Sequence, residues 1–170
     1  TLPQDKGAAL SPELLVFYGD GKLYYNAGLP DVCELVKKCV TEIVENYDVD
    51  GIVFDDYFYP YPANGAEFDD ADAYAKYGNG AERDDWRREN INRIVKSCRD
   101  GIKAIRSDCK FGVAPFGIWQ NDNGNNGGSE TSGLEGYSSL YCDALAWARE
   151  GYIDYLSPQL YWEFESASAP

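Results

Sequence analysis

Two adjacent carboxylates stand out in the segment VDGIVFDDYFYP, residues 49–60. Asp55 and Asp56 end a short apolar run, and aromatic residues follow them at once: Tyr57, Phe58, Tyr59 and Tyr61. Paired acids can protonate a glycosidic oxygen and stabilise the positive charge that develops on the sugar ring, while flat aromatic faces stack on pyranoses. The segment therefore suggests a carbohydrate site, the alternative being two acids that only form a turn beside the edge of the core.

Polar and aromatic residues also follow two later apolar runs. The first run is KFGVAPFGIW (110–119), which carries Phe116 and Trp119. The second is IDYLSPQLYW (153–162), which carries Gln159, Tyr161 and Trp162. A carboxylate pair, an amide and several rings that meet at one edge of a fold would suit a sugar ligand.

The composition excludes several other chemistries. The chain contains no histidine, so Ser-His-Asp and Cys-His catalysis are excluded and the commonest transition-metal ligand is missing. DNGNNG (122–127) does not fit a calcium loop, because glycines occupy its third and twelfth ligand positions, Gly124 and Gly133. FDDADAY (68–74) predicts a solvated acidic loop rather than a metal site. We therefore expect no metal and no cofactor.

The bulk properties indicate one acidic globular domain. A chain of 170 residues can bury a sizeable core, and its net charge of −14 repels phosphate backbones, so we expect no nucleic-acid partner. No apolar stretch approaches the roughly 20 residues that a membrane span needs. Five cysteines lack CxxC spacing and predict buried free thiols, with one incidental disulfide as the alternative: Cys33, Cys39, Cys98, Cys109 and Cys142.

Helices and strands are expected to alternate along the chain. Helical periodicity predicts helices at 31–46, after Pro30, and at 85–105, and Ser138 and Gly151 bound a third at 139–149. Continuous apolar runs predict buried strands at 51–54, from 110, and at 153–162, after two shorter strand-like runs within 1–28. The segments 60–83 and 120–136 are predicted to be loops.

This order is typical of α/β folds with parallel strands. Ligands bind in such folds at the carboxyl ends of the strands, where the long loops and both aspartates lie. The apolar stripe of the second helix, projected backwards, places Arg87 and Arg88 on the inward side of its first turn. They are predicted to lie near Asp55 and Asp56, the alternative being ion pairs with Asp84, Asp85 or Glu89.

Three stretches together resemble a known family: VDGIVFDDYFYPYP, DDWRRENINRIV with FGVAPFGIW, and GYIDYLSPQLYW. They are similar to the glycosyl hydrolase-like family 10 of bacterial envelope proteins, which includes a hydrolase of peptide-free peptidoglycan glycans. The resemblance covers roughly residues 13–162. It implies a (β/α)8 TIM barrel that acts on glycan strands, and export to the periplasm or as an outer-membrane lipoprotein.

The chain is too short for a whole barrel, which needs about 250 residues. The resemblance places its strands as about the fourth to sixth of the barrel, so residues 1–170 are expected to be the central part of one catalytic domain, incomplete at both ends. Open sheet edges would then be covered by a longer chain or by oligomerisation. Where relatives commonly have serine before PFG, this sequence has Ala114.

The resemblance also implies a reaction class. Adjacent acids on a fourth strand are similar to those of hexosaminidases, in which the N-acetyl group of the substrate attacks, and we prefer Asp56 as acid and Asp55 as the orienting group. The expected function is a glycosidase of N-acetylated glycans, with peptide-free peptidoglycan as the expected substrate. The alternatives are a retaining hydrolase of another polysaccharide and a glycan-binding protein without catalysis. The expected substrate-binding residues are Tyr57, Trp86, Arg87, Arg88, Trp119, Gln159, Tyr161 and Trp162.

Overall fold

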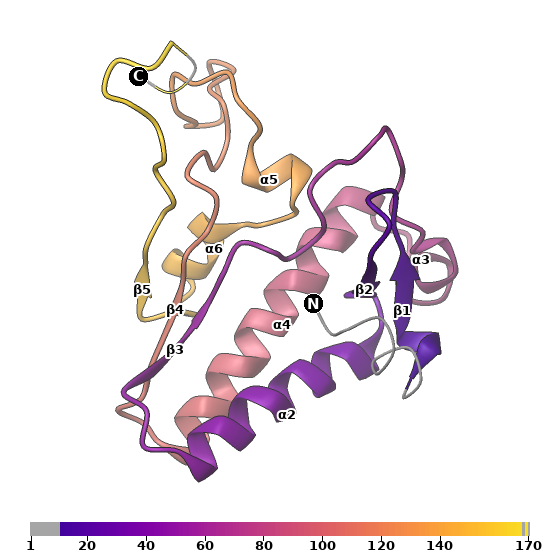
Figure 1. The fold of residues 1–170 in the computed structure, drawn as a ribbon, viewed down its shortest axis with the longest axis vertical. Helices are drawn as coiled ribbons and strands as arrows, with labels where there is room; N and C mark the ends of the chain where they lie inside the picture. Colours follow the sequence, from indigo (N-terminus) through magenta and orange to yellow (C-terminus); the bar gives the residue numbers. More distant parts are fainter. Residues whose placement is uncertain (1–10, 168, 170) are drawn as a thin grey trace.

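A three-stranded parallel sheet forms the centre of the molecule. The computed structural model describes residues 11–167 and 169. In the sheet, β3 (Gly51–Phe54), β4 (Lys110–Val113) and β5 (Tyr155–Leu156) lie in that order, and all three point upward in Figure 1. The predicted α/β class with parallel strands is confirmed. We call the carboxyl ends of these strands, with the residues directly after them, the rim.

Two long helices cover one side of the sheet. α2 (Pro30–Asn46) and α4 (Arg83–Ile105) pack side by side (Figure 1). Pro30 occupies the first turn of α2, where a missing N–H costs nothing. The α4 stripe is fully buried at Val95, Cys98 and Ile102, and it belongs to the same core as Phe111 and Val113 of β4. The two strongest sequence-predicted helices are therefore confirmed.

An antiparallel hairpin supports the long loop after β3. It consists of β1 (Leu15–Phe17) and β2 (Leu23–Tyr25), which follow the short 3-10 helix η1 (Pro12–Leu14). Tyr18, at the end of β1, is buried, accepts a bond from Ala63 N–H (3.3 Å) and donates to the Ala66 carbonyl (3.2 Å). The hairpin thus fixes the middle of the loop that carries the aromatic cluster.

The predicted third helix is wrong in its extent. The structure has two short helices there, α5 (Gly136–Ser139) and α6 (Ala144–Arg149), because Tyr141 adopts a left-handed backbone with φ of 55°. Asp143, not Ser138, caps α6 by accepting from Ala146 N–H. Gly151 ends that helix as predicted, with φ of 68°.

Two other segments also differ from expectation. The segment 60–83, predicted as loop, contains α3 (Ala71–Tyr77), whose seven residues, about two turns, are too few to show a clear apolar period. The last strand is only Tyr155–Leu156, and the ladder continues as one isolated bridge between Phe116 and Gln159. These short elements are compatible with part of a barrel, while the numbering of the strands as four to six stays a prediction.

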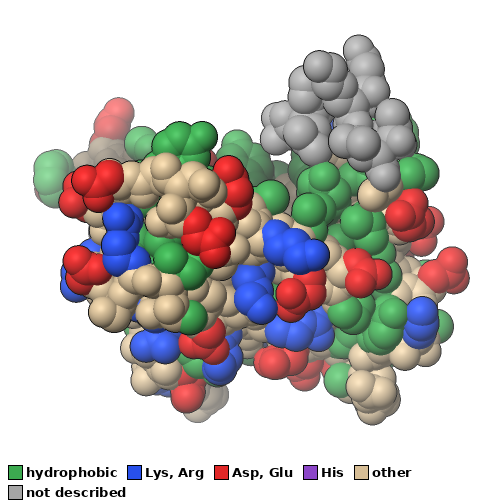
Figure 2. All heavy atoms as spheres, turned by 90° about the horizontal axis from the view of Figure 1, so that it is seen from below, with side chains coloured by type: hydrophobic (Ala, Val, Ile, Leu, Met, Phe, Trp, Pro, Cys, Tyr) green, Lys and Arg blue, Asp and Glu red, His purple; other side chains and the backbone are tan. Residues whose placement is uncertain are grey.

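Charges of both signs are mixed on the face opposite the rim. Figure 2 shows Lys and Arg side chains lying among Asp and Glu on that face, so the acidic surplus is not gathered there. Within residues 11–167 and 169, no helix combines the length and apolarity of a membrane span. All five cysteines are free thiols, and four are buried while Cys39 is exposed.

Candidate active site

Asp55 presents one carboxylate oxygen to the open side of the rim. Its Oδ1 accepts two hydrogen bonds, from Asp56 N–H (2.9 Å) and from Gln159 Nε2 (2.6 Å). Asp55 is exposed and lies on the same sheet face as Val53, which is 57% exposed. With Oδ1 held by two donors, Oδ2 is the atom left to meet a ligand.

Gln159 connects all three strands at the rim. Its Nε2 donates to Asp55, directly after β3, and to the Ala114 carbonyl after β4 (2.9 Å), and its backbone N–H donates to the Pro115 carbonyl (2.9 Å). Residues 104 positions apart are thereby joined. Both N–H groups of the amide are used, so the Gln159 side chain is fixed and in turn fixes the Asp55 carboxylate.

Asp56 points the other way and is buried. Consecutive side chains of an extended chain leave on opposite faces, as the sequence predicted for this pair. Asp56 is 3% exposed, and the Tyr61 hydroxyl donates a short hydrogen bond to its Oδ2. Burial, followed by this bond to the carboxylate, raises the pKa of Tyr61 well above its ordinary value. Tyr61 therefore stays a hydrogen-bond donor at any physiological pH.

A chain of aromatic rings runs along the rim beside the carboxylates. Tyr57 contacts Tyr61 at 5.8 Å between centroids, Tyr61 contacts Phe116 at 6.1 Å, and Phe116 contacts Trp162 at 5.8 Å. All three contacts are edge-to-face, a favourable geometry that fixes the ring planes. Tyr57 is 69% exposed, so the chain offers free aromatic surface next to the Asp55 carboxylate.

Gly117 allows the segments after β4 and β5 to approach closely. A Cβ at this position would collide with the Gln159 carbonyl oxygen and lie 2.6 Å from Cζ3 of Trp162. Because the first of these atoms is backbone, a side chain could be accommodated only by separating the two segments. Glycine here keeps Gln159 and Trp162 in place.

We expect Gly117→Ala to cost about 1–3 kcal/mol of stability through overpacking, and to lower activity by displacing Gln159 from Asp55. Gly136→Ala is the matched control, because its added Cβ would meet only ordinary contacts at 3.6 Å or more. Chemical unfolding and glycan turnover of both variants test this. Equal stability and equal turnover of the two variants would show that Gly117 is not needed for the close approach of the segments after β4 and β5.

Two of the predicted substrate-binding residues lie in the interior instead. Trp86 is 5% exposed and packs on Tyr74 of α3 (5.2 Å between centroids). Arg87 is also 5% exposed and forms an ion pair with Asp70. A buried ring and a buried, paired guanidinium offer no surface to a glycan, so we correct both assignments to structural roles.

Arg88 and Trp119 belong to a second cluster around Tyr137. The Arg88 guanidinium lies 4.1 Å from the centroid of Tyr137 and pairs with Asp85, as the alternative reading of the sequence had it. The Trp119 ring contacts Tyr137 at 5.7 Å, and its Nε1–H donates to Asp143 (3.3 Å). Among the described residues, the donors to Asp55 are Asp56 N–H and Gln159 rather than an arginine.

The remaining predicted residues are at the rim. Tyr57, Gln159 and Trp162 take part in the contacts described above, and Tyr161 is 87% exposed beside Trp162. Sequence reasoning named Tyr61 only as one of the aromatic residues and missed its bond to Asp56, and it missed Gly117, although both lie inside the motifs quoted for the family resemblance. Within the described part of the chain, no group of three acidic or cysteine side chains could hold a metal ion.

The fold is that of an α/β protein with a parallel sheet, and comparison with known proteins identifies its family. The family described as glycosyl hydrolase-like 10 matches residues 14–170, and the chain belongs to this family.

Individual relatives show the extent of the similarity. The glycosyl hydrolase YngK of Bacillus subtilis is 43% identical over 164 residues, which are 95% of this chain and 32% of YngK. The glycosyl hydrolase DigH of Escherichia coli K12 is 38% identical over 143 residues, or 84% of this chain and 32% of DigH. The chain thus spans about a third of the length of these curated relatives.

Proposed function

We propose that this chain carries the catalytic rim of a glycosidase that cleaves N-acetylated glycan strands, with peptide-free peptidoglycan as its substrate. One observation carries the proposal: Asp55 stands at the carboxyl edge of a parallel sheet, with Oδ1 fixed by two donors and Oδ2 open beside a row of rings. Family membership supports the reaction class. An exported location, in the periplasm or as a lipoprotein, belongs to the same proposal.

The burial of Asp56 supports Asp55 as the carboxylate that meets the substrate. We propose that Asp55 Oδ2 gives its proton to the glycosidic oxygen as the bond between that oxygen and C1 breaks. The hydrogen bond between Asp56 and Tyr61 then holds the segment directly after β3 in place. This reverses the order preferred from the sequence, in which Asp56 was the acid. The reason is that a carboxylate 3% exposed beneath Tyr61 has no route to the glycosidic oxygen.

A single exposed acid is sufficient if the substrate supplies the nucleophile. The carbonyl oxygen of the N-acetyl group then bonds to C1 as the leaving oxygen takes the proton from Asp55. In the second half of the reaction, Asp55 takes a proton from water as the water oxygen bonds to C1, and the acetamido group is restored. The opposite orientations of Asp55 and Asp56 favour this route over one in which these two residues are the flanking carboxylates, because that route requires both to face the sugar.

The experiment compares three glycans with the full-length protein. Peptide-free peptidoglycan strands should be shortened, the same strands after chemical N-deacetylation should be left intact, and a β-glucan without N-acetyl groups should also be left intact. Equal cleavage of deacetylated strands would instead indicate a retaining hydrolase with a protein nucleophile. Binding of the strands with no shortening would indicate a glycan-binding protein.

A further inference from the structure

A buried ion-pair network lies behind the aromatic cluster of the rim and takes no part in the proposed reaction. Its centre is Asp70, whose side chain is 0% exposed, paired with Arg87, whose side chain is 6% exposed. Arg87 Nε and Nη2 contact the two oxygens of Asp70, each at 2.8 Å. This two-point geometry adds both energy and geometric specificity to the ion pair.

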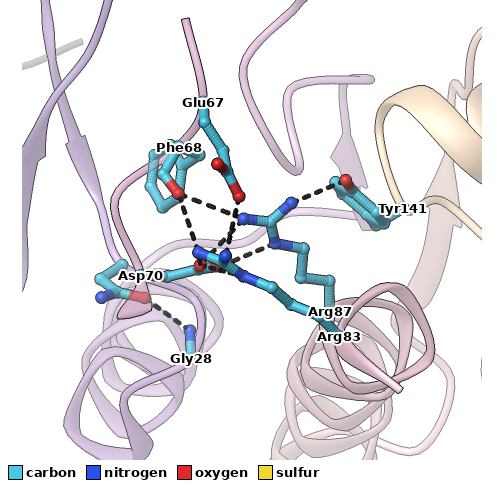
Figure 3. A network of polar contacts seen from close by, with 8 residues as sticks. Gly28, Glu67, Phe68, Asp70, Arg83, Arg87 and Tyr141 are labelled. Carbon is cyan, nitrogen blue, oxygen red and sulfur yellow. Dashed lines mark hydrogen bonds and ion pairs between the residues drawn. The ribbon is translucent and has the colours of Figure 1, made fainter. Parts of the chain in front are cut away.

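The same guanidinium joins three segments of the chain, its own helix and two others (Figure 3). Its Nη2 donates to the Phe68 carbonyl (3.1 Å), and its Nη1 donates to the Tyr141 hydroxyl (2.7 Å). Arg87 belongs to α4, Phe68 and Asp70 to the loop after β3, and Tyr141 to the junction between α5 and α6. Although burial alone lowers the pKa of Arg87, the Asp70 carboxylate outweighs it and holds that pKa above its ordinary value, so the charge is permanent.

The network encloses Tyr59, which lies between the two site residues Asp56 and Tyr61 in the sequence. The Tyr59 ring is 2% exposed and contacts Phe68 (5.2 Å), Tyr141 (4.9 Å) and the Arg87 guanidinium (5.6 Å). A side chain enclosed on three sides fixes the path of the backbone through it. Two residues later, Tyr61 donates its hydroxyl proton to the Asp56 carboxylate.

We propose that Arg87 and Asp70 are positioning residues, which hold Tyr59 and thereby place the Tyr61 hydroxyl on Asp56, and through it the Asp55 carboxylate. The inference rests on the proposed function for its kinetic test. It goes beyond a contribution to folding, because it predicts that a change at Arg87 lowers turnover only while the Tyr61 hydroxyl is present. The stability of the network alone would not produce such a dependence.

The test is a double-mutant cycle in the full-length protein. Arg87→Lys keeps the charge but loses the planar two-point fit, and we expect kcat on peptide-free glycan strands to fall roughly tenfold with KM little changed. In the Tyr61→Phe background the same change should lower kcat less than about twofold, because the hydrogen bond from Tyr61 to Asp56 is already missing. Arg83→Lys, one turn earlier and also bound to Asp70 but only partly buried, is the matched control and should cost less than about twofold. If the loss of kcat in the double variant equals the product of the losses in the two single variants, the two residues act independently and the proposal is overturned.

Hydrogen exchange provides a readout that does not need activity. Arg87→Lys should speed exchange of amides in residues 56–68, such as Phe58 N–H, which donates to the Asp56 carbonyl (3.0 Å), while α2 stays as protected as before. Unchanged exchange in residues 56–68, or an equal loss of protection in α2, would contradict the positioning role of Arg87. If the lysine variant does not fold, Tyr59→Leu removes the ring link without exposing a charge and must give the same pattern. A wild type that shortens no glycan would reject the proposed function, and the exchange result would still decide this inference.

Discussion

Asp55→Asn is expected to lower kcat on peptide-free glycan strands by about 10²–10⁴-fold, the usual contribution of a general acid. The amide oxygen of asparagine can still accept from Asp56 N–H and Gln159, so the geometry at the rim and the stability should be preserved. Only the atom that carries the proton is replaced. KM and the unfolding midpoint should therefore stay close to those of the wild type.

Two matched variants make this result specific. Asp50→Asn, an exposed aspartate just before the other end of β3, should leave turnover unchanged. Asp56→Asn keeps an acceptor for the Tyr61 hydroxyl and should cost much less than Asp55→Asn. A larger loss for Asp56→Asn than for Asp55→Asn would restore the order of roles preferred from the sequence.

Arg87→Met is expected to lower the free energy of unfolding by about 3 kcal/mol, because the buried Asp70 Oδ2 loses its charged donor and only the partly exposed Arg83 still pairs with Oδ1. Methionine fills much of the same volume, so the loss reports charge and hydrogen bonding rather than an empty cavity. Asp70→Ala should cost a similar amount for the mirrored reason, since the Arg87 charge would then be uncompensated.

A second pair on α4 provides the control. Lys96 and Asp100 form an ion pair at 2.5 Å, but both side chains are about half exposed. Pairs of this kind contribute about 0.2–0.5 kcal/mol, so Lys96→Met should hardly move the urea midpoint of the full-length protein. A loss from Arg87→Met no larger than that from Lys96→Met would show that the buried pair does not hold the loop in place.

The sequence predicts the elements that position the site better than the contacts within it. α2 and α4 are long and amphipathic, so their periodicity determines them almost to the residue. The break at Tyr141 is not visible in the sequence, because its left-handed backbone is stabilised by tertiary contacts to Arg87 and Tyr59 rather than by a local turn signal.

Asp70 is the clearest failure of sequence reasoning. It lies in an acidic run that predicts a solvated loop, and the structure buries it completely. Its partner Arg87 is 17 residues away on another element, so no local pattern reveals the pair. The helical period correctly predicts that Arg87 lies on the inward side of α4. It does not identify the partner of Arg87, which is Asp70 and not one of the rim carboxylates Asp55 and Asp56.

The pair Asp55 and Asp56 shows both the reach and the limit of strand geometry. Alternation along an extended chain correctly predicts that the two side chains leave on opposite faces. It does not tell which face is open, because that depends on Tyr61 and on Gln159, which lies 104 residues further along the chain. The assignment of roles therefore depended on the three-dimensional structure.

The most direct test of the central claim is mass spectrometry of peptide-free peptidoglycan strands after incubation with the full-length protein and with its Asp55→Asn variant at equal concentration. We predict shorter N-acetylated fragments with new reducing ends from the wild type, and strands of unchanged length from the variant, which should still bind them. Equal shortening by both proteins, or binding without shortening by the wild type, would contradict the assignment of Asp55 as the acid of a glycosidase.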